Sequence, residues 1–368
     1  MEYKLLPEVC HIQYGYPFDS EKFSKSEGIP LIRIRDVVRG FTETFTKELC
    51  SKEYVVKKGD ILVGMDGMFN IAKWEGQTGY LNQRVCKLVP NNLIFGDYLF
   101  YYMPCALKKI EDKTAFVTVK HLKAKQLNSI LVPCPPIEEQ KKISKVLSVI
   151  FQLIKQKEAQ LEYLDELIKS RFVEMFNNER QHYRLNEVCK IITDGTHQPP
   201  EFVSCGIPFI FVSNIVNNEI SYNTEKYITQ ETYNSLIVRT PIEMGDIILS
   251  TVGSYGHPAV VKNNKKFLFQ RHIAYLKPKH EIVDSDFLHS ALLSSNVQQQ
   301  IDRQVKGIAQ KTLNLSAIKQ LVVPIPKILE QRKFARLKNH IDKSKLAVKK
   351  SLEELETLKN SLMQQYFD

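Results

Sequence analysis

Hydrophobic residues along this chain follow two different periods, and the two patterns alternate. Residues 1–136 and 179–326 carry short apolar runs broken by glycine, asparagine and proline, which is typical of strands joined by turns. Residues 137–178 and 327–368 instead carry apolar residues at alternating steps of three and four, which indicates long helices with an apolar seam. The pattern therefore predicts two mixed α+β domains, each followed by a long helix.

Within each domain, the apolar runs give a coarse set of expected elements. Residues 31–38 and 209–216 are predicted as strands, and so are the runs that follow Gly59 and Gly245. Further strands are expected near the ends of both domains, in the segments 84–90, 128–135, 258–263 and 320–326. Helices are expected around 97–109 and 285–303. These elements make a mixed α/β or α+β domain whose topology the sequence leaves open.

The two halves of the chain repeat each other in the same order. LPEVC at 6–10 returns as LNEVC at 185–189, GIPLI at 28–32 as GIPFI at 206–210, and GDILV at 59–63 as GDIIL at 245–249. Gln83-Arg84 returns as Gln270-Arg271, and Gln140 returns as Gln331. The offset between matching residues drifts slowly, as expected for a duplication with short loop insertions. Two related domains without a shared task remain the alternative.

The two predicted helices carry no proline or glycine over 137–176 and 328–367, and each would be about 60 Å long. Prolines precede both, and Glu138 and Glu139 favour a helix start. The predicted seam residues, which we expect to bury the spacer or bind a partner, are Ile143, Leu147, Ile150, Ile154, Leu161, Leu164, Ile168, Phe334, Leu337, Ile341, Val348, Leu352, Leu355 and Leu362. Two such helices in one chain most simply pack antiparallel on each other, which gives the chain a pseudo-twofold layout. Packing of each helix on its own domain, or on another chain, stays open.

Searches for catalytic motifs in the sequence find none. It contains no GxxxxGK[ST] phosphate loop, no GxGxxG after a strand, and no Asn/Asp-Pro-Pro-aromatic motif of amino-group methyltransferases. The seven cysteines show no CxxC spacing, and the histidines show no ligand spacing, so neither a disulfide framework nor a metal site is expected. We expect no cofactor on this chain. The absence of a signal-like segment and of a run of about 20 apolar residues predicts a cytoplasmic protein without a membrane span.

The net charge of +10 suggests a polyanionic partner, and the placement of the cations strengthens that inference. No acidic residue lies between Asp112 and Glu138, nor between Asp302 and Glu330, although both stretches contain several lysines. A third acid-free run, between Asp246 and Glu281, is also rich in lysine. One such run is most simply a solvated face. Its recurrence at equivalent places in both halves favours neutralisation of phosphates.

Glycine-rich polar loops follow the GDI runs at 64–79 and 250–260, and a third polar turn, DGTHQPP, lies at 194–200. Loops of this kind can enter a DNA groove and bind base edges; ordinary turn chemistry is the alternative, and Trp74 and Tyr255 could equally pack in a core. From charge and loop position we predict the following DNA-binding residues: Arg33, Arg35, Lys73, Trp74, Arg84, Lys120, Lys123, Lys125, His197, Tyr255, His257, Arg271, Lys306 and Lys311.

The ordered set of motifs resembles the specificity subunit of type I restriction–modification systems. PPIEEQKKI at 135–143 and PKILEQRKF at 326–334 resemble the junctions between domain and helix in that family. GDILVGMDG, GDIILSTVGSYG and DGTHQPP resemble its strand–loop and entry-loop motifs, and the resemblance covers essentially the whole chain. It implies target-recognition domains at 1–136 and 179–326, with conserved spacer helices at 137–178 and 327–368.

The resemblance also implies a function without catalysis. Each recognition domain would read one half of a bipartite double-stranded DNA target, and the helices would set the gap between the halves. Two methyltransferase subunits would dock on the helical spacer, and restriction/translocase subunits would complete the complex. S-adenosylmethionine, ATP and Mg²⁺ are then expected only on those partners. The alternatives are a stand-alone pseudo-dimeric DNA-binding regulator, a self-sufficient nuclease, and a coiled-coil scaffold for an acidic protein.

Overall fold

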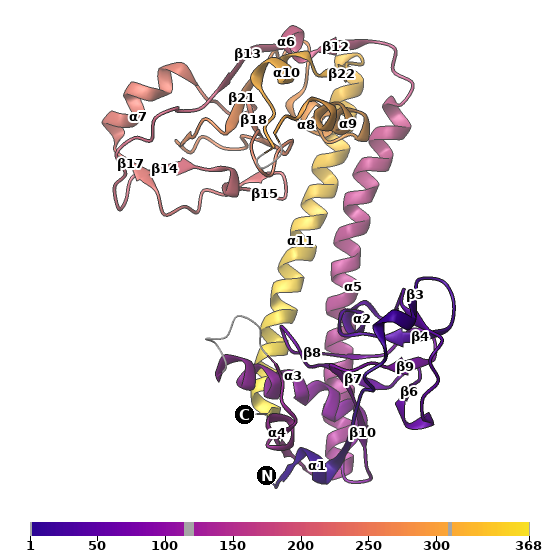
Figure 1. Ribbon diagram of the computed structural model, residues 1–368. Coiled ribbons are helices and arrows are strands. Elements are labelled where there is room, and N and C mark those ends of the chain that lie inside the picture. Colours follow the sequence, from indigo (N-terminus) through magenta and orange to yellow (C-terminus); the bar gives the residue numbers. More distant parts are fainter. Residues whose placement is uncertain (1, 114–120, 308–310, 368) are drawn as a thin grey trace. The chain divides into compact units, whose positions relative to one another are not determined.

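The structure is a computed structural model that describes residues 2–113, 121–307 and 311–367 (Figure 1). The chain forms two compact units, one made of Met1–Lys157 with Ser351–Asp368 and the other of Glu158–Lys350. Two continuous helices, α5 (Ile137–Phe176) and α11 (Ile328–Phe367), each contribute one part to each unit. Both long helices therefore lie where the alternating three- and four-residue steps predict them.

The described residues of the first unit form three sheets and a small set of helices. The sheets have the orders β1-β11, β2-β10-β7-β8 and β3-β5-β4-β9-β6. Their strands are β1 (Tyr3–Leu5), β2 (Cys10–Tyr14), β3 (Phe23–Ser24), β4 (Ile29–Ile32), β5 (Phe45–Thr46), β6 (Val55–Val56), β7 (Ile61–Gly64), β8 (Asn70–Lys73), β9 (Gly79–Leu81), β10 (Val85–Pro90) and β11 (Leu131–Pro133). The helices are α1 (Leu6–Val9), α2 (Ile34–Arg39), α3 (Gly96–Lys113) and α4 (Ala124–Asn128).

The second unit repeats two of these sheets, whereas the five-stranded sheet is replaced by two smaller ones, β17-β14-β20 and β15-β16. The order β12-β22 corresponds to β1-β11, and β13-β21-β18-β19 corresponds to β2-β10-β7-β8. The strands are β12 (His182–Arg184), β13 (Cys189–Asp194), β14 (Ile207–Ile210), β15 (Ile215–Val216), β16 (Glu219–Ile220), β17 (Tyr227–Ile228), β18 (Ile247–Ser250), β19 (Pro258–Val260), β20 (Leu268–Phe269), β21 (Ile273–Pro278) and β22 (Val322–Pro324). The helices are α6 (Leu185–Val188), α7 (Gln230–Leu236), α8 (Ser285–Leu292), α9 (Ser295–Gln304) and α10 (Leu315–Gln320). The parallel pair β4–β9 likewise has its counterpart in β14–β20, so the duplication is a duplication of fold.

Three predicted elements differ in the structure. The run 209–216 leaves strand β14 at Ile210 and forms a 3-10 turn, Val212–Asn214, before the short strand β15. The run 31–38 leaves the strand β4 at Ile32 and enters helix α2, because the Asp36 carboxylate accepts the Arg33 backbone N–H at 2.9 Å and Gly40 ends the helix with φ +75°. A valine-rich run thus becomes helical through its caps. The predicted helix at 285–303 is two helices, α8 and α9, since Ser294 takes an extended conformation and begins the second one.

In each unit, segments of α5 and α11 pack antiparallel on each other and on the domain. In the second unit the ring centroids of Phe172 and Phe334 lie 5.4 Å apart, and Asp165 pairs with Lys345 farther along α11. In the first unit Lys359 lies over the Phe151 ring, and Phe367 packs between Tyr98 and Tyr102. The two long helices therefore pack both on each other and on the domain, and the two predicted alternatives occur together.

One predicted seam residue is misplaced. Leu337 is 36% exposed, whereas the next residue, Lys338, is buried at 6%. The regular steps of four and three run Phe334, Lys338, Ile341, Lys345 and Val348. Lysine therefore occupies the position for which Leu337 was predicted, and a second lysine occupies the position between Ile341 and Val348 for which no residue was predicted. Ile143, Leu147, Ile150 and Ile154 are buried, as are Phe334, Ile341 and Val348. The remaining predicted seam residues are half-buried: Leu161, Leu164, Ile168, Leu352, Leu355 and Leu362.

Candidate nucleic-acid interface

In the first unit, three turns that are distant in sequence meet at the ends of β7, β9 and β10. Backbone hydrogen bonds join them: the Met65 N–H donates to Arg84 O at 2.9 Å, and the Leu122 N–H donates to Met65 O at 2.7 Å. Residues 65–68, 83–84 and 121–123 therefore form one surface, which we call the first turn cluster. It brings together two of the predicted residues, Arg84 and Lys123.

The second unit builds the same arrangement from the corresponding turns. The Thr251 N–H donates to His272 O at 3.0 Å, and the Leu313 N–H donates to Thr251 O at 2.8 Å. Residues 251–257, 270–272 and 311–313 form the second turn cluster. It holds the predicted residues Tyr255, His257, Arg271 and Lys311, and Lys306 joins it through paired backbone hydrogen bonds with Thr312. Two copies of one basic surface thus exist, one in each unit.

Electrostatics in the first turn cluster centre on Asp66. Its carboxylate lies 2.7 Å from His121 Nδ1 and 3.5 Å from Arg84 Nε. Arg84 itself has φ +72°, a left-handed conformation that the turn imposes on a non-glycine residue. The Arg84 side chain remains 58% exposed, so Asp66 orients the guanidinium while leaving it open to solvent. An oriented, exposed guanidinium can donate in a fork to a phosphate or to a guanine edge.

The second turn cluster carries an aromatic ring between charged groups. The Tyr255 hydroxyl donates to Asp302 Oδ1 at 3.0 Å, and Lys311 Nζ lies 5.9 Å from the centre of the Tyr255 ring. Arg271 is exposed and lies beside His272, whose pKa is lowered by burial and by the Arg271 charge. A half-buried tyrosine with exposed cations around it offers both a stacking face and phosphate donors.

The DGTHQPP turn borders an open cleft of about 480 Å³ in the second unit. His197 Nε2 lies 2.9 Å from Asp194 Oδ2, and the same carboxylate pairs with Arg239, which ends the 3-10 turn Ile237–Arg239 after α7. The turn is joined to the second turn cluster, because the Arg271 N–H donates to Thr196 O at 3.0 Å. Gly195 is required there, since a Cβ would lie 2.2 Å from Phe269 O, and Gly15 in the first unit is equally confined against Asn82 O at 2.0 Å.

Trp74 is a correction to the predicted set. The indole is 1% exposed, packs with Ile32 and Leu62 in the core, and donates its N–H to Gln77 O at 2.8 Å. A side chain with its donor satisfied inside a core cannot reach DNA without unfolding the domain, so Trp74 is excluded. The alternative of core packing is the correct one for this residue.

Other predicted residues lie apart from the turn clusters or carry partners of their own. Lys73 Nζ lies 2.7 Å from Asp97 and 5.2 Å from the Phe100 ring centre. Arg33 lies over the Phe23 ring, and Arg35 donates to Thr44 at 3.2 Å and lies 3.7 Å from Asp36. Lys125 is exposed on α4, and His257 contacts Asn218 at 3.3 Å. Lys120 lies outside the described residues.

Several residues of these surfaces escaped the sequence reasoning, and they are mainly acidic. Asp66, Asp194 and Asp302 each pair with a predicted residue although they lie outside the acid-free runs. A carboxylate close in space can be far away in sequence, so a local absence of acids does not make a surface acid-free. Arg239 was also missed, because no sequence signal connects it to Asp194 across 45 positions. His121 lies in the acid-free run between Asp112 and Glu138, but it was not predicted as a DNA-binding residue.

No helix among the described residues is both long and apolar enough to cross a membrane. Over the same residues, no group of three or more His, Cys, Asp or Glu side chains is placed to hold a metal ion.

Comparison with known proteins identifies the family. The model of the type I restriction modification DNA specificity domain matches residues 1–163 and again residues 177–357. The type I restriction enzyme EcoBI specificity subunit of Escherichia coli is 30% identical, over 98% of this chain and 84% of the relative. The MjaVIII specificity subunit of Methanocaldococcus jannaschii is 25% identical, over 88% of this chain and 81% of the relative.

Solved structures show the same fold. The S subunit of a type I restriction–modification system from M. genitalium superposes with a TM-score of 0.61 at 15% identity, over 100% of this chain and 96% of that one. A chain from a structural study of complex assembly and conformational transition in the type I system gives 0.56 at 16% identity, over 100% and 97%. With a family model that matches both units and relatives that span nearly the whole chain, this protein belongs to the family of type I restriction–modification DNA specificity subunits.

Proposed function

We propose that each unit reads one half of a bipartite double-stranded DNA target, and that the turn clusters are the reading surfaces. The observation that carries this proposal is the duplication of one basic surface. Arg84 and Arg271 lie in corresponding turns at adjacent positions, since the backbone contacts of Arg84 match those of His272. A chain with two readers recognises two separated sequences, as two-headed DNA-binding proteins do. The helix α5 is about 60 Å long, which is ample for a separation of one turn of B-DNA, ~34 Å.

The proposed partners of the long helices are two methyltransferase subunits. Several large apolar side chains on α5 and α11 remain exposed: Tyr163 at 75%, Leu346 at 69%, Leu329 at 64%, Val173 at 52% and Val149 at 49%. Scattered exposed apolar residues are ordinary, but this many on two helices favours a protein partner. Restriction/translocase subunits would then join the methyltransferase complex.

In this proposal the chain itself catalyses nothing and holds no cofactor. S-adenosylmethionine, ATP and Mg²⁺ act on the partner subunits, and the complex works in the prokaryotic cytoplasm, where the chromosome lies. The family membership supports this division of labour. It also argues against the stand-alone regulator, which would need no methyltransferase.

The test is methylation mapping in cells that express the chain together with the methyltransferase subunits of its own system. We expect one methylated motif made of two short specific sequences around a fixed gap, and no methylation when this chain is omitted. A continuous motif would contradict the proposal of two readers. Methyl transfer by the purified chain alone, with S-adenosylmethionine, would contradict the non-catalytic role.

A further inference from the structure

A buried glutamine joins each long helix to its domain in the same way. Gln140 in the first turn of α5 donates to Pro135 O at 2.8 Å and Leu93 O at 3.1 Å, and accepts from the Phe95 N–H at 2.8 Å. In the second unit, the buried Gln331 makes the corresponding contacts with Pro326, Ile282 and Asp284, at 2.7, 3.0 and 2.9 Å. We call Gln140 and Gln331 the joint glutamines, and residues around them occupy equivalent positions in the two units.

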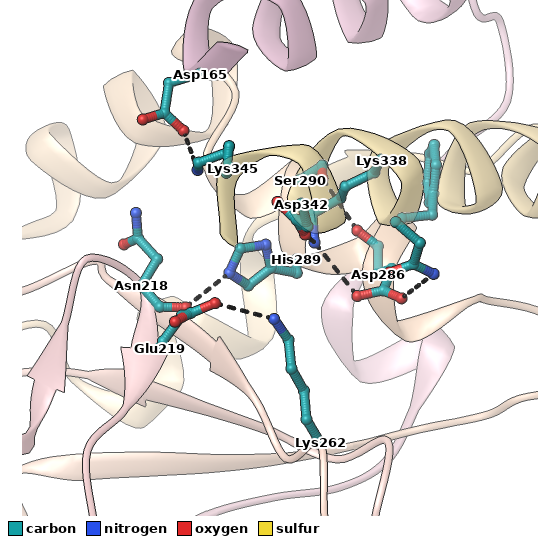
Figure 2. A network of polar contacts seen from close by, with 12 residues as sticks. Asp165, Asn218, Glu219, Lys262, Asp286, His289, Ser290, Lys338, Asp342 and Lys345 are labelled. Carbon is teal, nitrogen blue, oxygen red and sulfur yellow. Dashed lines mark hydrogen bonds and ion pairs between the residues drawn. The ribbon is translucent and has the colours of Figure 1, made fainter. Parts of the chain in front are cut away.

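The second unit adds a charged contact beside this joint. Lys338 on α11 lies 3.3 Å from Asp286 in the first turn of α8 and 3.3 Å from Asp342 on its own helix, with its side chain 7% exposed (Figure 2). Asn339 donates to the other oxygen of Asp286 at 3.3 Å. The Asp286 carboxylate is thus held by two consecutive residues of α11, so helix α8 of the domain is tied to the long helix.

The corresponding aspartate of the first unit has a different partner. Asp97 corresponds to Asp286. The N–H of Phe95 donates to Gln140 and the N–H of Asp284 donates to Gln331, and each aspartate lies two residues after that donor. Asp97 takes its lysine from within the domain, Lys73 of β8, at 2.7 Å. The helix position that matches Lys338, seven residues after the joint glutamine, holds Leu147, which is fully buried. One unit therefore has an apolar contact where the other has an ion pair.

These two kinds of contact constrain a domain differently. Apolar burial is non-directional and tolerates small rotations, whereas a hydrogen-bonded ion pair requires a defined distance and angle. Burying a lysine in a helix seam also costs desolvation free energy. The ion pair is therefore better explained by the geometry that it fixes than by stability that it adds. The pair belongs to a larger polar network at the same face, in which Lys262 pairs with Glu219, and Lys345 pairs with Asp165 of α5 (Figure 2).

We propose that Lys338 is a positioning residue that fixes the second recognition domain on α11 and thereby sets the gap at which the second half-site is accepted. This inference rests on the proposed reading of a bipartite target. It assigns gap selectivity to a joint between domain and helix, in addition to the length of the helices.

The test uses the complex with its methyltransferase subunits and DNA duplexes that carry the wild-type half-sites at the native gap or at gaps one base pair shorter or longer. In Lys338→Leu, which introduces the residue of the first unit, we expect the ratio of methylation rates between native and altered gaps to fall about tenfold, as expected when one charge-assisted contact is lost. The half-site sequences should not change. Lys338→Arg should retain the ratio, and so should Lys343→Leu, a matched change at an exposed position of α11.

Two outcomes separate this inference from the proposed function. If Lys338→Leu lowers methylation of all three duplexes by the same factor, Lys338 only stabilises the fold and the inference is wrong, while bipartite reading stands. If the wild-type complex methylates none of them selectively, the proposed function itself fails. Should Lys338→Leu not fold, Asp286→Asn decides: it leaves Lys338 paired with Asp342, and we expect a smaller loss of the same ratio, whereas an unchanged ratio overturns the inference.

Discussion

His289 is a buried histidine held in its neutral form. Its Nε2 lies 3.2 Å from Asn218 O, which calls for a proton on that nitrogen, and its Nδ1 is buried without a hydrogen-bond partner among the described residues (Figure 2). Burial, and then the nearby Lys338 charge, lower the pKa of His289 from 6.5 to about 4. The first unit has Phe100, an aromatic ring without a titrating group, three residues after Asp97, just as His289 lies three residues after Asp286.

This histidine predicts a loss of stability at mildly acidic pH. Between pH 6.5 and about 4 the unfolded chain binds a proton that the folded chain does not, so stability is complete above pH 6.5 and falls as the pH drops through this window. We expect the His289 contribution to fall by about 2 kcal/mol between pH 7 and pH 5. Urea unfolding of the wild type and of His289→Leu at both values measures it. An equal pH dependence in the two proteins would refute the assignment.

Arg84 and Arg271 are expected to contribute one DNA contact each, in separate half-sites. For Arg84→Ala and for Arg271→Ala, we predict that DNA affinity falls about tenfold and that the slope of log affinity against log salt decreases by about one. Fluorescence anisotropy of a labelled duplex at several salt concentrations measures both quantities. Lys350→Ala, an exposed change on α11, serves as the control and should leave both unchanged. Wild-type affinity and slope in both arginine variants would remove the turn clusters from the interface.

Sequence reasoning proposed cations for the DNA interface but not the groups that surround them. Arg84 and Arg271 were selected because the Gln-Arg dipeptide recurs, although the structure aligns Gln270 with Asn82 and therefore Arg271 with Gln83. Their acidic and aromatic neighbours depend on how strands bring distant turns together, as with Asp66 and Asp302. Trp74 could not be placed from sequence, since an aromatic residue beside a polar loop is compatible with either side of the domain surface.

The net charge of each long helix changes from basic in its first half to acidic in its second half, which favours antiparallel packing within each unit. In the second unit the α11 segment 328–350 has eight basic and two acidic residues, while the α5 segment 158–176 has two basic and five acidic residues. The first unit pairs the basic segment 137–157 of α5 with the acidic segment 351–367 of α11. Opposite charges therefore face each other in the antiparallel arrangement, whereas a parallel arrangement would place like charges together.

The pair of Lys345 and Asp165 tests this complementarity. With Asp165 53% exposed, the pair contributes less than about 1 kcal/mol. Lys345→Asp should lower the midpoint of urea unfolding slightly more than Lys345→Ala does, because it opposes two carboxylates. The double variant Lys345→Asp/Asp165→Lys should recover most of that loss. If the double variant is no more stable than Lys345→Asp, charge pairing does not specify the helix register.

Exposed apolar residues on the long helices predict where the methyltransferase subunit docks. Tyr163→Lys should weaken co-purification with the methyltransferase subunit while leaving DNA binding by the isolated chain unchanged, because Tyr163 is 75% exposed on α5 and far in sequence from the turn clusters. Gln160→Lys, on the same helix, provides a matched change of charge. Retention of the methyltransferase subunit by Tyr163→Lys at wild-type stoichiometry would place the docking surface elsewhere.

Helices and strands were predicted correctly where the hydrophobic pattern repeats over many turns. The prediction was wrong where a few local contacts determine the secondary structure. The helices at 137–176 and 328–367 follow from many turns of repeated spacing. Helix α2 depends on a single carboxylate cap and one glycine, which outweigh the strand preference of the valines around them. Lys338 and Lys345 are seam residues that an apolar pattern cannot reveal, since their burial depends on acidic partners from α8, α5 and α11 itself.

At the scale of the whole chain, the duplication was the most informative sequence feature. Five short matches in constant order predicted two similar mixed α+β domains, and the two units share strand orders and the glutamine joint. The sequence could not give the topology of the domains, because it depends on long-range strand pairing such as β2 with β10 and β1 with β11. The boundaries predicted at 136, 178 and 326 remain predictions.

The two domains are proposed to read separate half-sites, and a domain exchange is the decisive test. Residues 179–326 would be replaced by the corresponding residues of the Escherichia coli EcoBI specificity subunit, and the methylated motif would be mapped in cells with the methyltransferase subunits of this system. We predict a motif in which one half is replaced and the other half is retained. A motif changed in both halves, or left wholly unchanged, would contradict it.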